Sequence, residues 1–263
     1  NYFGGVIGDS TGTSLKNCNN YGTVSGTGNY AGGIVGYATS GLTISNCTNA
    51  NDIKVNGFYI GGIAGTSLTN VVITDCINEN TIDGKKYVAG VSGYTKGSLQ
   101  NCVNSGLIIG TDQSVGGIAG YATGAITLSN CHNKNEVNSS NSYVGGIVGT
   151  SSDNVVVSDC TNGGLIIGDS YVAGIVGYSK GMIQNCFNFG TVDAFNQSVG
   201  GISGYSFGAI TQCQNEGMIG GSLFVGGIAG VSGKNSRVDQ CTNKGNITGE
   251  RSIGGIVGTQ SEN

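Results

Sequence analysis

One five-residue pattern, Gly/Ala-Gly-Ile/Val-x-Gly, returns along the whole chain at a nearly constant interval. A fixed period of this kind predicts a repeat architecture, in which each unit stacks on the next. The second glycine of the pattern stands at Gly5, Gly33, Gly62, Gly90, Gly117, Gly146, Gly174, Gly201, Gly227 and Gly255.

The cysteines keep the same period and reveal further columns. An aliphatic residue stands three before each cysteine, Asn, Asp or Gln one before, and Val or Ile six after. The nine cysteines are Cys18, Cys47, Cys76, Cys102, Cys131, Cys160, Cys186, Cys213 and Cys241. Asparagine always follows two residues later, at Asn20, Asn49, Asn78, Asn104, Asn133, Asn162, Asn188, Asn215 and Asn243. Each column predicts a ladder of like side chains along the stack.

A longer period lies above the first. Residues 32–115 and 116–199 align without a gap over 84 positions, of which 44 are identical. We interpret them as tandem 84-residue units of three coils each, followed by a diverged third copy from residue 200. The chain is therefore expected to be one continuous domain over residues 1–263, with nine to ten repeats, and a segment of a longer protein.

These patterns predict an all-β fold, a single-stranded parallel β-helix (β-solenoid) with about 28 residues per coil and about nine coils. Helical-pair repeats need about 33 residues or more, whereas short runs of β-branched residues between glycines favour strands. We expect about three strands per coil, and coils about 4.8 Å apart in a rod roughly 43 Å long.

Five columns are predicted to point inward. They are the residue before the glycine pair, the Ile/Val after it, the aliphatic residue before cysteine, the cysteine itself, and the Val/Ile six residues later. The second glycine of the pair never varies, although Ala89 and Ala173 replace the first. We expect this second glycine to adopt a positive φ or to form a bulge where a Cβ would clash.

Composition excludes several classes of partner. Glycine makes up 51 of 263 residues, proline is absent and the net charge is −4. The 11 lysines and arginines form no basic patch, which argues against a nucleic-acid partner. No apolar run approaches about 18 residues, so we expect no membrane insertion.

The single histidine, His132, follows Cys131, and this arrangement raises the question of a metal site or an activated thiol. The residue after cysteine differs in almost every repeat, so we expect His132 to point outward and the pair to have no function. Stacked cysteines stand about 4.8 Å apart, too far for ideal disulfides. No C-x₂-C pair offers zinc ligands. We predict a buried ladder of reduced thiols and no metal, with disulfides and zinc as the alternatives.

The asparagine ladder is expected to hydrogen-bond from coil to coil and to bind turn backbone. Tyrosines form two partial columns, which we interpret first as packing on the flank of the rod and second as the best candidate ligand surface. That candidate surface comprises Tyr30, Tyr59, Tyr87, Tyr143, Tyr171, Tyr37, Tyr94, Tyr121, Tyr178 and Tyr205. The 15 acidic residues show no shared recurrence, and no phosphate loop or nucleophile elbow occurs, so we predict no catalytic residue and no cofactor.

The stretch VGGIAGYATGAITLSNCHNKNEVNSS resembles the GLUG repeat, in which serine often stands where this chain has cysteine. The resemblance extends over essentially the whole chain. GLUG repeats occur in large bacterial cell-surface and secreted proteins of adhesin-like character, and they also flank the catalytic part of IgA-specific metalloproteases. The resemblance implies an extracellular, non-catalytic segment and carries over no catalytic residue.

Three functional hypotheses follow. The first is a non-enzymatic structural or adhesive region of a large extracellular or cell-surface protein, with host glycans or proteins as partners. The second is a subunit of an extracellular filament, in which neighbouring copies stack head to tail through strand edges. The third is a carbohydrate-binding or carbohydrate-active β-helix.

Overall fold

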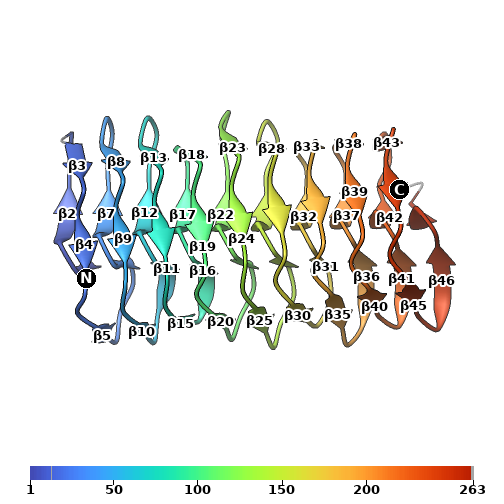
Figure 1. Ribbon diagram of the computed structural model, residues 1–263, viewed down its shortest axis with the longest axis horizontal. Helices are drawn as coiled ribbons and strands as arrows, with labels where there is room; N and C mark the ends of the chain where they lie inside the picture. The colour runs from blue at the N-terminus through green and yellow to red at the C-terminus, as the bar shows by residue number, and fades with distance from the viewer. Residues whose placement is uncertain (13, 262–263) are drawn as a thin grey trace.

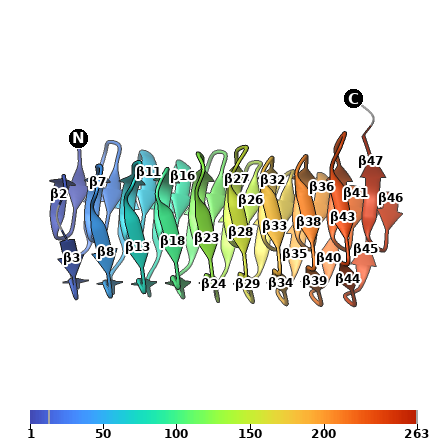
Figure 2. The same ribbon diagram turned by 90° about the horizontal axis from the view of Figure 1, so that it is seen from above.

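The computed structural model describes residues 1–12 and 14–261, so residues 13, 262 and 263 of the predicted domain lie outside the described part. Coils stack in one row along the long axis, with the N-terminus at one end and the C-terminus at the other (Figure 1). Turning the molecule by 90° shows the same single row (Figure 2). The prediction of an all-β parallel solenoid is therefore confirmed. Among the described residues, no helix is long and apolar enough to cross a membrane.

Each coil visits five parallel sheets in turn, which we number in chain order. Over the described residues, the first two sheets have ten strands each and the other three have nine. The strands of the first sheet are β1 (Phe3–Gly4), β6 (Ala31–Gly32), β11 (Phe58–Gly61), β16 (Lys86–Ala89), β21 (Val115–Gly116), β26 (Val144–Gly145), β31 (Val172–Ala173), β36 (Gln197–Gly200), β41 (Leu223–Gly226) and β46 (Arg251–Gly254). The strands of the second sheet are β2 (Ile7–Ser10), β7 (Val35–Ala38), β12 (Ala64–Ser67), β17 (Ser92–Thr95), β22 (Ala119–Ala122), β27 (Val148–Ser151), β32 (Val176–Ser179), β37 (Ser203–Ser206), β42 (Ala229–Ser232) and β47 (Val257–Gln260).

The other three sheets complete each coil. The strands of the third sheet are β3 (Ser14–Lys16), β8 (Thr43–Ser45), β13 (Val72–Thr74), β18 (Ser98–Gln100), β23 (Thr127–Ser129), β28 (Val156–Ser158), β33 (Met182–Gln184), β38 (Ala209–Thr211) and β43 (Arg237–Asp239). The strands of the fourth sheet are β4 (Asn19–Asn20), β9 (Thr48–Asn49), β14 (Ile77–Asn78), β19 (Val103–Asn104), β24 (His132–Asn133), β29 (Thr161–Asn162), β34 (Phe187–Asn188), β39 (Gln214–Asn215) and β44 (Thr242–Asn243). The strands of the fifth sheet are β5 (Val24–Gly26), β10 (Ile53–Val55), β15 (Ile82–Gly84), β20 (Ile108–Gly110), β25 (Val137–Ser139), β30 (Ile166–Gly168), β35 (Val192–Ala194), β40 (Ile219–Gly220) and β45 (Ile247–Thr248).

The expectation of three strands per coil was wrong, because sharp bends divide the coil into five shorter ones. One bend separates the third sheet from the fourth, at the residue before each cysteine, where φ lies between 50° and 57°. Asparagine and aspartate tolerate this left-handed conformation better than other non-glycine residues. That tolerance explains the seven Asn and Asp members of the column, which are Asn17, Asn46, Asp75, Asn101, Asn130, Asp159 and Asn185. Gln212 and Gln240 complete the column with the same conformation.

The five predicted inward columns are buried, and they form two separate apolar cores. In a representative coil Ile34, Ile44, Cys47, Ile53 and Ile60 are all 0% exposed. The first three columns belong to one cluster and the last two to another. Between the clusters, the asparagine ladder faces the glycine pairs. The cross-section therefore has a polar seam between two apolar halves.

At the second glycine of the pair the expected clash with a Cβ is present from Gly5 to Gly227, but the expected positive φ is absent. The described glycines with positive φ are Gly12, Gly28, Gly41 and Gly124, and none of them belongs to this column. A Cβ on Gly146 would instead lie 2.1 Å from the carbonyl oxygen of Gly174 and 2.5 Å from Cγ of Asn162. Side chains are excluded because the next coil and the asparagine ladder approach too closely.

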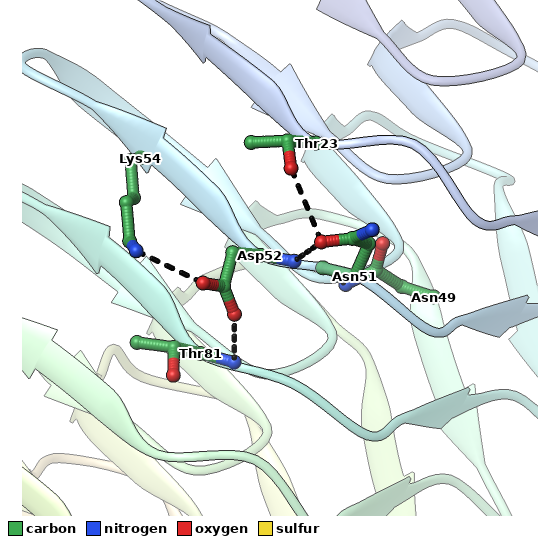
Figure 3. Close-up of polar contacts among 6 residues, drawn as sticks. All are labelled: Thr23, Asn49, Asn51, Asp52, Lys54 and Thr81. Atoms are coloured by element: carbon green, nitrogen blue, oxygen red, sulfur yellow. Dashed lines mark hydrogen bonds and ion pairs between the residues drawn. The ribbon is translucent and has the colours of Figure 1, made fainter.

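Polar side chains also join neighbouring coils at the corner that precedes the fifth sheet (Figure 3). Asn51 Oδ1 accepts hydrogen bonds from Thr23 Oγ1 at 3.1 Å and from the Asp52 amide at 2.8 Å. Asp52 accepts from the backbone amide of Thr81 at 3.3 Å and pairs with Lys54 Nζ at 2.9 Å. The hydrogen bond from Lys54 lowers the pKa of Asp52. Both members of this ion pair have exposed surface, so it contributes little to stability.

Candidate functional site

The asparagine ladder is a continuous hydrogen-bonded column inside the rod. Each Nδ2 donates to Oδ1 of the asparagine in the next coil, at 2.7 to 2.9 Å, from Asn20 to Asn243. Asn133 Nδ2 also donates to the carbonyl of Asn135 at 2.7 Å, and Asn133 is 1% exposed. The predicted coil-to-coil and turn contacts are confirmed. Because both Nδ2 hydrogens are used within the protein, the ladder has a structural role.

Replacing Asn133 with aspartate tests this role. The new carboxylate still accepts from Asn104 Nδ2 but offers no hydrogen to Asn162 Oδ1, which receives one at 2.8 Å in the native chain. We expect Asn133→Asp to reduce the free energy of unfolding by about 3–5 kcal/mol at neutral pH, as for an uncompensated buried charge. Part of the loss should be recovered at low pH, where the carboxyl group regains a proton. Urea denaturation at two pH values measures both effects.

The matched control is Asn130→Asp, at an exposed position of the column that already contains Asp75 and Asp159. It introduces the same charge nearby on the surface, and we expect a loss below about 1 kcal/mol, as for most surface substitutions. Equal losses in the two variants would show that the ladder has no special energetic role.

The cysteines form a second internal column of free thiols. All nine are unpaired, seven are buried, and the end members Cys18 and Cys241 are half-buried. Burial raises the pKa of the Cys186 thiol well above its ordinary value. The prediction of reduced, buried thiols in place of disulfides agrees with this arrangement, because each thiol packs as a small apolar group in the larger core.

Cys131 and His132 do not form a site, because their side chains lie on opposite faces of the strand wall. Cys131 is buried with the core cysteines, whereas His132 lies outside, with Nδ1 2.7 Å from Thr161 Oγ1. Burial, followed by the charge of Lys134, lowers the pKa of His132. Among the described residues, no three His, Cys, Asp or Glu side chains gather as metal ligands would.

The structure brings all ten predicted tyrosines together on one flank of the rod. Five stand directly before a strand of the first sheet or are the second residue of one, and five lie in strands of the second sheet. Rings of the two columns contact each other edge to face, as Tyr30 and Tyr37 do at 5.2 Å. Within a column they stack, as Tyr59 and Tyr87 do at 5.0 Å. Stacked and edge-to-face pairs are the favoured aromatic geometries. We call this surface the tyrosine stripe.

Two members of the tyrosine stripe were missed from the sequence. Tyr2 contacts Tyr30 and Tyr37 at one end, and Phe207 lies 4.7 Å from Tyr205 at the other. The repeat could have revealed Tyr2, which precedes its glycine pair by the same two positions as Tyr30 does. Phe207 has no such signal, because threonine, leucine, lysine, serine and glycine occupy its column in other coils.

The first tyrosine column has a strained backbone in coils with and without tyrosine. The φ angle is 62° at Tyr30 and 65° at Tyr143, but also 65° at Ser114 and 53° at Phe224. A bulky residue in this region is uncommon and costs about 1–3 kcal/mol. Since serine and phenylalanine adopt the same conformation, the bend belongs to the fold and is no special feature of tyrosine.

Comparison with known families agrees with the repeat found in the sequence. Residues 111–138 match the family model described as the GLUG motif. The matched segment contains strands β21 to β24 and ends within β25, so it spans one coil of the rod. No curated protein matches the chain, and no solved structure matches it. The chain is thus a parallel β-solenoid that carries the GLUG motif and is consistent with a GLUG-repeat region.

Proposed function

We propose that this chain is a non-enzymatic rod within a large extracellular or cell-surface protein, and that the tyrosine stripe is its adhesive contact face. The observation that carries the proposal is that interior and surface columns of each coil have different roles. Cysteine, asparagine and aliphatic columns stabilise the interior, whereas the tyrosines gather on one flank and remain partly exposed. An aromatic surface that keeps polar hydroxyl groups is typical of contact faces.

Immunolabelling in the native host tests the location. An antibody against residues 1–263 should stain intact cells or detect the chain in the culture medium. Staining that appears only after the cells are permeabilised would contradict the proposed location, although the fold would stand.

The filament remains a second candidate, because interior columns become exposed at the two end coils. Val6 is 41% exposed, Ile253 48% and Ile256 39%, whereas Ile34 and Ile228 of the same columns as Val6 and Ile256 are fully buried. A further coil would cover these side chains, whether it belongs to the same chain or to a second copy, and a second copy has the matching columns.

Sedimentation velocity over a concentration series tests this candidate. Stacking predicts rods that lengthen with concentration, and Ile253→Lys combined with Ile256→Lys should abolish the growth. Phe195→Lys, at a side chain 70% exposed beside the fifth sheet, is the control that should leave growth unchanged. A single sedimenting species at every concentration would refute the filament.

A further inference from the structure

The tyrosine stripe is interrupted at one place, where small hydroxyl side chains stand in both of its columns. Ring contacts run without a break from Tyr2 to Tyr121 and resume at Tyr143. Between these blocks, Ser114 Oγ lies 2.8 Å from Thr150 Oγ1. One coil earlier the corresponding diagonal is filled by two rings, Tyr87 and Tyr121, at 5.7 Å. A pair of rings is therefore missing, and we call the resulting gap the notch.

The notch is a cavity of about 300 Å³ with aromatic walls and a hydroxyl floor. Tyr87 and Tyr121 form one wall, Tyr143 and Tyr178 form the other, and Ser114 and Thr150 lie in the lining between them. Tyr87 and Tyr143 stand two coils apart in one column, a separation of about 9.6 Å at the usual strand spacing. A single six-membered ring placed midway would lie at the distance of a stacked neighbour, close to the 5.0 Å of Tyr143 and Tyr171.

Charged groups at the rim of the notch favour the binding of an anionic ligand. Lys86 and Lys180 both line the notch, and Lys86 Nζ lies 4.9 Å from the centre of the Tyr87 ring. Burial raises the pKa of Tyr121 and of Tyr178 most, neighbouring tyrosines raise it further, and the charge of Asp153 contributes least. Among the described residues, the lining of the notch therefore has two amines and no carboxylate, on a chain whose net charge is −4.

We propose that the notch binds one pyranose ring of an acidic glycan, namely a hexuronic acid unit. The C–H faces of the sugar would stack between Tyr87 and Tyr143, its hydroxyls would reach Gln113 and the floor, and its carboxylate would meet the lysine amines. A few convergent polar groups among aromatic walls are typical of small-ligand sites. This assignment rests on the adhesive role proposed above and names its ligand class.

Another cavity fits a ligand less well. A second cavity of about 300 Å³ lies at the corner of the fifth sheet and is lined by Lys54, Asp83, Lys85 and glycines, among others. It has no aromatic wall, and Lys54 is already paired with Asp52. The notch is therefore the better site, because it combines stacking surfaces with available amines.

The three-coil repeat indicates a substitution that should fill the notch and keep a backbone conformation already present in the chain. Tyr30 occupies the position equivalent to Ser114 in the preceding three-coil period and has the same left-handed backbone, with φ of 62° against 65°. Thr66 is the equivalent of Thr150 in that period. It is 2% exposed, and its side-chain hydroxyl has no hydrogen-bond partner among the described residues. Because Tyr30 already lies opposite Thr66, the fold accommodates a tyrosine at this position. Ser114→Tyr should thus fold normally and close the notch.

Ligand-observed saturation-transfer NMR on the intact chain tests the proposal, with methyl β-D-glucuronide as probe and methyl β-D-glucoside as its uncharged counterpart. We expect the glucuronide to bind more tightly than the glucoside. Ser114→Tyr should weaken glucuronide binding at least tenfold. Lys180→Gln should weaken it about threefold and leave glucoside binding unchanged.

The wall and rim variants each have a matched control at the equivalent position of the preceding three-coil unit. Tyr178→Ala removes a wall of the notch, whereas Tyr94→Ala removes the equivalent ring where the stripe is continuous. Lys96→Gln is the corresponding control for Lys180→Gln. Only the variants at the notch should lose binding, although both tyrosine variants should lose similar stability.

Three results would overturn the assignment. The first is glucuronide binding that survives Ser114→Tyr, and the second is no measurable glucuronide binding at all. Tighter binding of N-acetyltyrosine amide than of the glucuronide would also overturn it and assign the notch to a protein side chain. None of these results bears on cell-surface location, which the immunolabelling test decides separately.

Discussion

Gly146→Ala is expected to destabilise the rod more than the same methyl group added one residue earlier. The new Cβ would lie 2.1 Å from the Gly174 carbonyl oxygen and 2.5 Å from Cγ of Asn162. Neither atom belongs to a flexible surface side chain, so the coil must shift and the asparagine ladder must break at that point. Overpacking and the loss of buried hydrogen bonds together predict a loss of about 3–5 kcal/mol in the free energy of unfolding. Urea denaturation followed by circular dichroism measures it.

The neighbouring substitution Gly145→Ala is the control. It adds the same methyl group in the first glycine column, where the chain itself places Ala89 and Ala173, and Ala173 pairs with Gly145 in the first sheet. A Cβ on Gly145 would also lie close to backbone, 2.0 Å from the carbonyl oxygen of Val148, but none of its three nearest atoms belongs to the asparagine ladder. Because the backbone accommodates a Cβ in this column at Ala89 and Ala173, we expect a smaller loss. If Gly146→Ala were the milder of the two, close contact with the next coil would not be the reason for the invariant glycine.

Alkaline pH is expected to unfold the rod through its cysteine column. A hydrogen bond with Cys131 and burial raise the pKa of Cys102, and burial raises that of Cys186. The pKa of Cys160 is raised as well. An unfolded thiol ionises near pH 8.5, whereas these thiols stay protonated in the folded state. Their contribution is therefore fully present below about pH 8.5 and is lost as the pH rises further.

The size of this effect follows from linkage. Each pH unit above about 8.5 costs about 1.4 kcal/mol for every thiol that stays neutral only in the folded state. Three such thiols predict a loss of about 6 kcal/mol by about pH 10. Urea midpoints measured from neutral to alkaline pH give the slope. The variant with Cys102, Cys160 and Cys186 all replaced by alanine starts less stable but should lose stability less steeply. Parallel slopes for the two proteins would refute the explanation.

The repeat made the fold predictable because a parallel stack repeats each environment in every coil. Five inward columns, the asparagine ladder and the outward position of His132 could all be assigned from recurrence alone. In a stack, each column of side chains samples one environment once per coil. A fold without repeats shows each environment only once. Because this rod shows each environment in every coil, its register could be predicted without reference to other proteins.

Other features depend on local geometry that recurrence does not encode. The Asn, Asp or Gln before cysteine marks a left-handed bend that divides one predicted strand into two, and its residue preference was the available signal. The second glycine of the pair has no positive φ and is needed because the next coil lies too close for a Cβ. The sequence alone does not distinguish this cause from a turn with positive φ. The notch could not be predicted from the sequence. In the first tyrosine column Ser114 is only a position without tyrosine, and Thr150 belongs to the second column. Their proximity is seen only in the structure.

The most direct test of a surface-exposed rod is residue-resolved labelling of intact cells of the native host. A lysine reagent that does not cross membranes is applied before lysis, and labelled peptides are identified by mass spectrometry. Lys96 and Lys180 are exposed beside the tyrosine stripe, so we predict that both are labelled on intact cells or in secreted protein. Labelling of these lysines only after lysis would contradict it.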